Sequence, residues 1–428
     1  MILSKRKNNF IMNKNMYSFP LFFGLTHIGQ VFSLGWAHKF KNAAVYDDDI
    51  NLLSNFKNGD LTSEEPDLNF FFKKNKKKIF FIDKKSEIKK FKNVFFTFDT
   101  PLNSNGEPMQ EIVNQKLIDT IKLLSPNTNL ILLSQVYCGF TDNFYKHFCK
   151  IRKINLIYMV DTLIMGKSFN SFLKPKRLIF GIKKRVKFLD VFKKFNCPVF
   201  FLNFQQAEMV KISINLYLFA NVTFANCLDY YCREKNFKFR DITTPIKLDD
   251  RIGLNSYLNP SLGISGGHLE RDLFTTLCSA KNNYVKNFFE VLKKINNSRF
   301  DLLKNALFNQ MSLKSYAKII WFGPSYKKDS FSIKNSPYLK LLNYLKKRNQ
   351  ELYCHDAIHK ISFLKNNIRN PFIFKKNKNY LLIYNYSNSE IKNKIKNVIK
   401  NNKNIECFNI SFNDFIYKEN LKNYINIL

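Results

Sequence analysis

The chain has 428 residues and a formal net charge of +36, with 69 Lys and Arg against 33 Asp and Glu. Its length is too great for one ordinary hydrophobic core and predicts two or three domains, while 45% hydrophobic and 16% aromatic residues exclude a disordered chain. The charge suggests a nucleic-acid binder, but the basic residues are spread from Lys5 to Lys422, so nucleic acid stays a minor alternative to an anionic small molecule.

The cysteines and the apolar segments exclude further classes of protein. The eight cysteines show no CxxC pair and no Cys/His spacing typical of zinc. We therefore expect no metal site, no disulfide framework and a cytoplasmic location. The longest apolar segment, 209–228, contains Lys211 and several asparagines, which predicts a buried helix and no membrane span.

A strand, a glycine turn, a helix and a second strand follow one another near the N-terminus. The apolar residues 17–24 lead into Gly24-Leu-Thr-His-Ile-Gly29, and the strand-like residues from Ala43 end at Asp47. This order is typical of a Rossmann unit, in which glycines admit the cofactor pyrophosphate at a helix N-terminus and the acid binds the ribose. Thr26 occupies the place of the second glycine, and we expect its side chain to crowd the pyrophosphate.

Further apolar runs predict a parallel sheet; they are residues 78–82, 94–98, 129–133 and 155–159. Residues 205–235 then predict one long helix that connects domains. Its expected apolar side carries Ala207, Val210, Ile214, Leu218, Val222 and Ala225. This apolar surface is wide for a lone connector, so we expect a homodimer built on the helix.

The same order of elements occurs again later in the chain. Residues 317–323 predict a strand that ends in a glycine turn, residues 336–345 a helix, and residues 351–354 a further strand. The predicted fold class is therefore α/β, with two Rossmann-like domains joined by a long central helix and a helical dimerisation region. The predicted domains are residues 1–204, 205–300 and 312–428. His355 and His359 have the spacing of a metal pair, but their place after a Rossmann-like strand favours a structural role.

An ordered series of motifs resembles that of the nucleotide-sugar dehydrogenases, the family of UDP-glucose 6-dehydrogenase. Its first members are residues 24–29 with Asp47, 58–59, 65–68, 99–101, 134–136, 161–163 with Gly166, 175–177 and Gly181. Its later members are residues 207–211 with Asn215, 250–253, 263–272, 323–327, Lys334, 336–337 and 353–356. The resemblance covers roughly residues 17 to 390.

The resemblance implies an NAD-dependent enzyme that oxidises the primary alcohol of a nucleotide sugar, most simply a UDP-sugar, toward the uronic acid. The cofactor-binding residues that it implies are Gly24, Thr26, Gly29, Asp47, Thr100 and Lys334. The substrate-binding residues that it implies are Arg251, reaching across a dimer, Gly266 and Lys327. Lys211, Asn215 and Asp272 resemble the residues that remove the alcohol proton and stabilise the alkoxide, and Asp161 stands where the family has a glutamate for release of the acyl group.

The position of the family's nucleophilic cysteine is occupied by His268. That cysteine holds the aldehyde as a thiohemiacetal before the second hydride leaves, and imidazole is no close substitute, although it can act as a base toward an aldehyde hydrate. Cys278, which we expect on the following helix, is not favoured as a replacement. Two hypotheses follow: an enzyme impaired in the second oxidation, or a catalytically inactive homologue that binds a nucleotide sugar.

Overall fold

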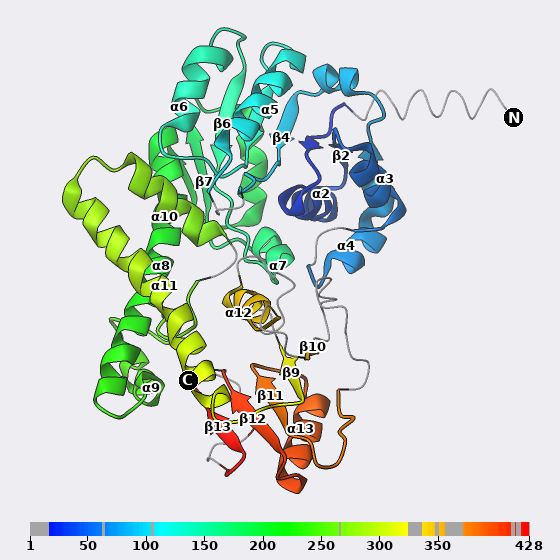
Figure 1. Cartoon of the computed structure of the whole chain (residues 1–428). Coiled ribbons are helices and arrows are strands. Elements are labelled where there is room, and N and C mark those ends of the chain that lie inside the picture. The colour runs from blue at the N-terminus through cyan, green and yellow to red at the C-terminus, as the bar shows by residue number, and fades with distance from the viewer. Residues whose placement is uncertain are drawn as a thin grey trace, which may run out of the picture. The chain divides into compact units, whose positions relative to one another are not determined.

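The computed structural model describes residues 17–61, 65–103, 107–264, 267–323, 336–346, 351–355, 371–411, 416 and 421–427. The chain divides into two compact units, Met1–Ile214 and Asn215–Leu428, and Figure 1 shows each built on a sheet with helices around it. The predicted α/β fold with two Rossmann-like sheets and a long helix is confirmed. The three domain boundaries stay a prediction.

The first unit contains an eight-stranded sheet in the order β3-β2-β1-β4-β5-β6-β7-β8. Its strands are β1 (Leu21–Phe23), β2 (Ala43–Tyr46), β3 (Ile79–Phe81), β4 (Asn93–Phe96), β5 (Asn129–Leu132), β6 (Asn155–Met159), β7 (Leu178–Ile182) and β8 (Val199–Leu202). The first six strands, β1 to β6, all pair in parallel, as predicted. Strand β7 runs antiparallel to β6. The sequence of a short apolar strand that is buried on both faces does not reveal whether the strand pairs in parallel or antiparallel.

Helices cover both faces of this sheet, and each face has its own core. Helices α5 (Gln110–Leu123) and α6 (Phe140–Phe144) pack on one face, and α2 (His27–Phe40), α3 (Ile50–Asn58), α4 (Leu68–Asn75) and α7 (Ser168–Leu173) on the other. Short helical segments complete the unit: η1 (Lys76–Lys78), η2 (Lys85–Lys90), η3 (Tyr145–Cys149) and η4 (Lys187–Phe195). Successive strand residues point to opposite faces, so Leu21 and Phe23 belong to one core and Phe22 to the other.

Helix α8 (Phe204–Glu234) confirms the predicted long helix, and the boundary between the units falls within it. The predicted apolar side is wrong for most of its length, because Val210, Ile214, Leu218 and Val222 are only partly buried. The buried positions of the helix mix polar residues, which are Glu208, Asn215, Thr223, Asn226 and Asp229, with apolar ones such as Ile212, Leu216 and Phe219. Hydrophobic periodicity cannot mark such a face.

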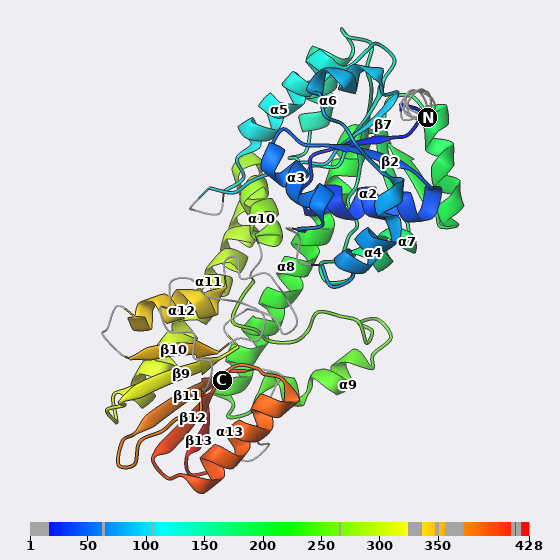
Figure 2. The same cartoon turned by 90° about the vertical axis from the view of Figure 1, so that its right-hand side faces the viewer.

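The second unit begins with helices and ends with a five-stranded parallel sheet in the order β10-β9-β11-β12-β13. Its helical elements are η5 (Phe239–Asp241), α9 (Thr243–Lys247), α10 (His268–Ser279), α11 (Asn283–Met311), α12 (Pro337–Lys346) and α13 (Ser389–Asn401). Its strands are β9 (Lys318–Phe322), β10 (Leu352–His355), β11 (Tyr380–Tyr384), β12 (Ile405–Asn409) and β13 (Tyr424–Asn426). Helix α12 covers one face of the sheet and α13 the other (Figure 2), which is the doubly wound arrangement.

A glycine follows the first strand of this sheet, as the sequence predicts. Gly323 has a φ of +71°, and a Cβ atom there would lie 2.5 Å from the carbonyl oxygen of Tyr386. Among the described residues, no helix is both long enough and apolar enough to cross a membrane.

Candidate active site

The glycine turn of the first unit has the backbone that a dinucleotide requires. Gly24 ends β1 with a φ of +107°, and a Cβ atom on Gly29 would lie 1.8 Å from the carbonyl oxygen of Gly24. Helix α2 can therefore approach the strand only because Gly29 has no side chain. The helix begins at His27, so its first backbone N–H groups, which lack partners within the helix, face the turn.

The side chain of Thr26 is hydrogen-bonded to the segment that follows β4. Its hydroxyl group donates to the carbonyl oxygen of Thr97 at 2.6 Å, and the hydroxyl of Thr97 donates to the carbonyl oxygen of Gly24 at 2.6 Å. The Thr26 side chain is thus held against the end of β4. Thr100, another expected cofactor residue, donates its hydroxyl to the carbonyl oxygen of Gln135 at 2.6 Å and so joins the segments that follow β4 and β5.

Asp47 lies at the end of β2 and is 4% exposed. Its carboxylate accepts the backbone N–H of Leu25 at 2.6 Å and that of Asp49 at 2.9 Å. Burial raises the pKa of Asp47, against these two hydrogen bonds, which lower it. Since a carboxylate can accept about four hydrogen bonds, it orders the glycine turn and keeps acceptor capacity for ribose hydroxyls.

Lys211 and Asp161 lie together in the first unit. The ammonium group of Lys211 donates to the backbone carbonyl of Asp161 at 2.9 Å, and its distance to the Asp161 carboxylate is 3.8 Å. The carboxylate also accepts the N–H of Leu163 at 2.9 Å. Both side chains remain partly exposed, so an ammonium and a carboxylate are available at the end of β6.

Asn215 and Asp272 lie together in the second unit. The side-chain amide of Asn215, on α8, donates to the Asp272 carboxylate, on α10, at 2.6 Å. Asn215 is 6% exposed and Asp272 is 3% exposed. Asn215 follows Lys211 on α8 by one helical turn, so this one helix carries both the ammonium and the amide that the resemblance assigns to alkoxide stabilisation.

His268 is the first residue of α10, after Gly267 with its φ of +84°. Arg271, one turn later, approaches Nδ1 of His268 at 3.2 Å through Nη2 and the Asp272 carboxylate at 3.6 Å through Nε. A guanidinium only donates, so Nδ1 of His268 is the acceptor in this contact. The expectation for Cys278 is wrong in one respect, because it lies on α10 itself and not on a following helix.

The expected substrate residue Arg251 pairs within its own loop. Its guanidinium contacts the Asp249 carboxylate at 2.7 and 2.9 Å, and its side chain is 87% exposed. The assigned residues Gly266, Lys327 and Lys334, as well as His359, lie outside the described residues. Within the described part of the chain, no group of His, Cys, Asp and Glu has the geometry to hold a metal ion.

A polar cluster around Glu65, whose contacts the sequence did not predict, lies at the start of α2. Glu65 is buried and accepts hydrogen bonds from His27 Nε2 at 2.9 Å, Gly166 N at 2.8 Å and the hydroxyl of Ser168 at 2.7 Å. It ties the start of α2 to the segment before α7. Burial acts to raise the pKa of Glu65, but the hydrogen bonds from His27, Ser168 and Gly166 together hold it below its ordinary value.

Comparison with known proteins assigns both parts of this arrangement to one family. A model described as "UDP-glucose/GDP-mannose dehydrogenase family, NAD binding domain" matches residues 21–195, and one for the family's central domain matches residues 205–298. The chain is 25% identical over 370 residues to a UDP-glucose 6-dehydrogenase of Campylobacter jejuni, covering 82% of this chain and 89% of that protein. It is 23% identical over 319 residues to a UDP-N-acetyl-D-mannosamine dehydrogenase of Methanocaldococcus jannaschii, covering 72% and 73%.

Solved structures show the same fold at low sequence identity. A UDP-glucose dehydrogenase from Pyrobaculum islandicum aligns with a TM-score of 0.79 and 16% identity over 96% of this chain and 98% of that one. A UDP-D-ManNAc dehydrogenase from Pyrococcus horikoshii aligns with a TM-score of 0.78 and 18% identity over 95% and 98%.

Proposed function

The chain belongs to the UDP-glucose/GDP-mannose dehydrogenase family, an oxidoreductase family that uses NAD, and from this premise we propose that it oxidises the primary alcohol of a UDP-sugar. The observation that carries the proposal is the hydrogen bond from Asn215 to the buried carboxylate of Asp272. It gives the second unit an oriented proton acceptor next to an amide donor, which is what removal of an alcohol proton needs.

The residues of the first unit fit NAD. Gly24 and Gly29 leave no side chain between β1 and the start of α2, the Thr26 hydroxyl is engaged by Thr97, and Asp47 retains acceptor capacity at the end of β2. The N-terminus of α2 would hold the pyrophosphate, and Asp47 the ribose hydroxyls. When bound, NAD supplies the acceptor for the hydride.

In the first oxidation the chain has to hold the alcohol, remove its proton and stabilise the alkoxide. We assign the proton to Asp272, whose orientation Asn215 fixes, and the stabilisation of the alkoxide to the Lys211 ammonium and the Asn215 amide. The hydride leaves the same carbon, which gives an aldehyde. Asp161, beside Lys211, stands where the family has a glutamate for release of the acyl group, and in this chain we assign it as a base toward the water that hydrates the aldehyde.

We expect the second oxidation, from aldehyde to acid, to be slow in this chain, because His268 stands in place of the nucleophilic cysteine. A thiol would add to the aldehyde and give a tetrahedral carbon from which a second hydride can leave. His268 offers instead an imidazole whose Nδ1 lies 3.2 Å from Nη2 of Arg271. The aldehyde can proceed only as its hydrate, so the enzyme accumulates aldehyde or forms acid slowly. The alternative is an inactive homologue that retains nucleotide-sugar binding.

We also propose that the protein is a homodimer assembled on α8. Tyr217, Phe224 and Tyr231 repeat every seven residues along this helix and are 68%, 55% and 58% exposed. Positions seven apart lie on one face of a helix, so the three aromatic rings form a stripe. A second copy would bury this stripe against the same stripe of its partner, since a two-fold interface pairs identical surfaces.

Incubation of the purified protein with NAD and a panel of UDP-sugars tests the function, with reduced cofactor followed by absorbance and products by mass spectrometry. We expect cofactor reduction with at least one UDP-sugar and loss of nearly all of it in Lys211→Met. Lys235→Met, which changes an exposed lysine in the turn directly after the same helix, is the matched control and should retain activity. If calorimetry also detects no binding of any UDP- or GDP-sugar at millimolar concentration, both the enzyme and the inactive homologue are ruled out.

A further inference from the structure

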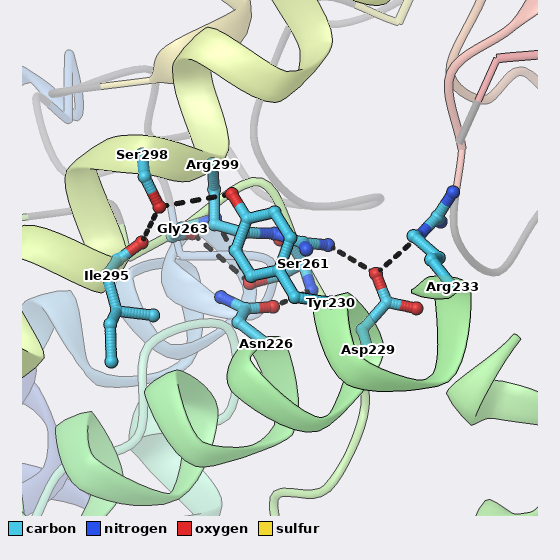
Figure 3. Close-up of polar contacts among 9 residues, drawn as sticks. All are labelled: Asn226, Asp229, Tyr230, Arg233, Ser261, Gly263, Ile295, Ser298 and Arg299. Atoms are coloured by element: carbon cyan, nitrogen blue, oxygen red, sulfur yellow. Dashed lines mark hydrogen bonds and ion pairs between the residues drawn. The ribbon is translucent and has the colours of Figure 1, made fainter. Parts of the chain in front are cut away.

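In the second unit, polar side chains from two helices hydrogen-bond to a short loop at Ser261 (Figure 3). Asn226 of α8 accepts the backbone N–H of Ser261 at 2.8 Å, and Arg299 of α11 donates through Nε to the carbonyl oxygen of the same residue at 2.9 Å. Both peptide groups of Ser261 are therefore bound by side chains. Asn296, also on α11, accepts the N–H of Ile264 at 2.7 Å.

Arg299 is itself held from several sides. It is 0% exposed and donates through Nη2 to Asp229 at 2.9 Å. Asp229 also accepts from Nε of Arg233 at 2.9 Å. The guanidinium lies 4.8 Å from the centre of the Tyr230 ring, and the Tyr230 hydroxyl is 3.0 Å from that of Ser298. The guanidinium cannot turn away from Ser261 without breaking this set of contacts.

Stability alone is a poor explanation for such a network. A buried ion pair is often no more stable than well-packed apolar side chains of similar volume. Nδ2 of Asn226 is buried and has no hydrogen-bond partner in the described part of the chain, which is costly. The position is therefore better explained by the one contact that the Asn226 side chain does make, its acceptance of the Ser261 N–H.

The place of the loop indicates its use. Ser261 to Ile264 precede α10, which starts at His268 and carries Asp272. Helix α8 binds this stretch at both ends, through Asn226 at Ser261 and through Asn215 at Asp272. About three turns of α8, roughly 16 Å, separate the two asparagines. One rigid helix thus sets the distance between the loop and the carboxylate.

We propose that Asn226, Asp229 and Arg299 are positioning residues, which fix the loop 261–264 and through it the N-terminus of α10 with His268 and Asp272. In this role the three residues act through the loop and not by contact with the substrate or the cofactor. This inference deepens the proposed function and rests on it for its effect on turnover, but the fixing of the loop itself can be measured without turnover.

Two kinds of variant test the network. Asp229→Leu with Arg299→Met replaces the ion pair by apolar side chains of similar size, which keeps the packing and removes the donor to Ser261. Asn226→Leu removes only the acceptor. Asn221→Leu, on the same helix and outside the network, is the matched control for the second variant. Leu303→Ala, one turn beyond Arg299 and fully buried, controls for a general loss of stability.

The readouts are thermal unfolding, amide hydrogen exchange and steady-state kinetics. We expect amide exchange in peptides covering 258–264 to rise at least about tenfold in both test variants, with unchanged exchange in β11. With a UDP-sugar, kcat should fall about tenfold or more while KM changes less than about threefold, because misplacement by about 1 Å costs up to a hundredfold in rate. Both controls should leave the exchange of the loop and kcat near the wild-type values, even where Leu303→Ala lowers the melting temperature.

Two results would overturn the inference. One is wild-type protection of 258–264 in the test variants. The other is a Leu303→Ala protein that reproduces their full pattern, which would make the network a source of stability only. If the double variant does not fold, Asn226→Leu and its control decide. If wild type shows no turnover with any UDP-sugar, the proposed function fails, while amide exchange still decides whether the network fixes the loop.

Discussion

Asn215 on α8 and Asp272 on α10 share a hydrogen bond of 2.6 Å between their side chains, and both residues are almost completely buried. One carboxylate oxygen of Asp272 accepts the hydrogen bond from the Asn215 amide. The other oxygen lies 3.6 Å from Nε of Arg271. A carboxylate fixed in this way is a positioned base, and its charge is the property that matters for proton removal.

Asp272→Asn is therefore expected to lower kcat by about a hundredfold or more, the usual contribution of a positioned general base. Affinity for the UDP-sugar, measured by calorimetry, should change little, because the substitution preserves the shape of the side chain. Asp301→Asn, on the exposed side of α11, is the control. An Asp272→Asn enzyme with wild-type kcat would remove Asp272 from the reaction.

Gly29→Ala tests the glycine turn. The added Cβ atom would lie 1.8 Å from the carbonyl oxygen of Gly24, so α2 must move away from β1. We expect NAD binding to be lost and the free energy of unfolding to fall by roughly 1–3 kcal/mol, the range for overpacking. Gly35→Ala is the matched control, because a Cβ atom there would lie 2.4 Å from the Phe172 ring and so overpacks the same helix away from the turn. Fluorescence titration with NADH that gives equal affinity for Gly29→Ala and wild type would show that the turn is not the cofactor site.

The order of elements could be predicted from the sequence because each one has a local signature. Apolar runs gave β1 to β6 and β9, and glycines at 24, 29 and 323 marked the turns. The antiparallel direction of β7 has no such signature, since both faces of the sheet are covered. The buried side of α8 was misplaced for a related reason, as Glu208, Asn215 and Asn226 are buried through hydrogen bonds that depend on tertiary structure.

In the candidate site, too, residues with a local sequence pattern could be predicted, whereas contacts that depend on tertiary structure could not. The resemblance predicted roles for Asp47, Lys211, Asn215 and Asp272, but not the hydrogen bonds that order the segments around them. Glu65 and Ser168 are far apart in the sequence and meet only in the fold. Arg271 stands beside His268 in the sequence, and only the geometry of α10 shows that it occupies Nδ1 of the imidazole.

Glu65 predicts a dependence of stability on acid pH. Its pKa in the folded protein lies below the ordinary value of a glutamate, despite burial, because of hydrogen bonds from His27, Ser168 and Gly166. A lowered folded pKa means that its contribution is complete above the unfolded pKa and is lost as pH falls through the folded value. We expect Glu65→Gln to be less stable than wild type near neutral pH and the difference to shrink below a pH of about 4.5. Thermal unfolding at a series of pH values measures this, and a difference that is constant with pH would contradict it.

The aromatic stripe of α8 predicts the oligomeric state. Phe224→Glu places a charge in the middle of the stripe formed with Tyr217 and Tyr231, and burying an unpaired charge in an interface is strongly unfavourable. Light scattering at micromolar concentration should give a dimer for wild type and a monomer for Phe224→Glu. Phe70→Glu, which changes a 59% exposed phenylalanine of the first unit, should remain a dimer. A monomeric wild type would contradict the proposal.

The last prediction concerns His268 and separates the two oxidations. Alcohol oxidation requires a base, a cation and NAD, whereas aldehyde oxidation requires an adduct from which hydride can leave. The position is well suited to a thiolate, because it is the first residue of α10 and the guanidinium of Arg271 lies next to it. A helix N-terminus and a neighbouring cation both lower the pKa of a thiol and favour the nucleophilic form.

His268→Cys should therefore increase the formation of uronic acid, by about tenfold or more, while the affinity for UDP-glucose changes little. The gain is limited by Asp161, which stands where the family has a glutamate, since small errors in position are costly. Product analysis by mass spectrometry with NAD and UDP-glucose measures acid and aldehyde separately. His268→Ala is the control, because it removes the imidazole without supplying a thiol and should show no gain. If wild type already forms uronic acid at a rate that the cysteine variant does not exceed, the thiol is not what the second oxidation lacks, and Nε2 of His268 becomes the group to examine as its substitute.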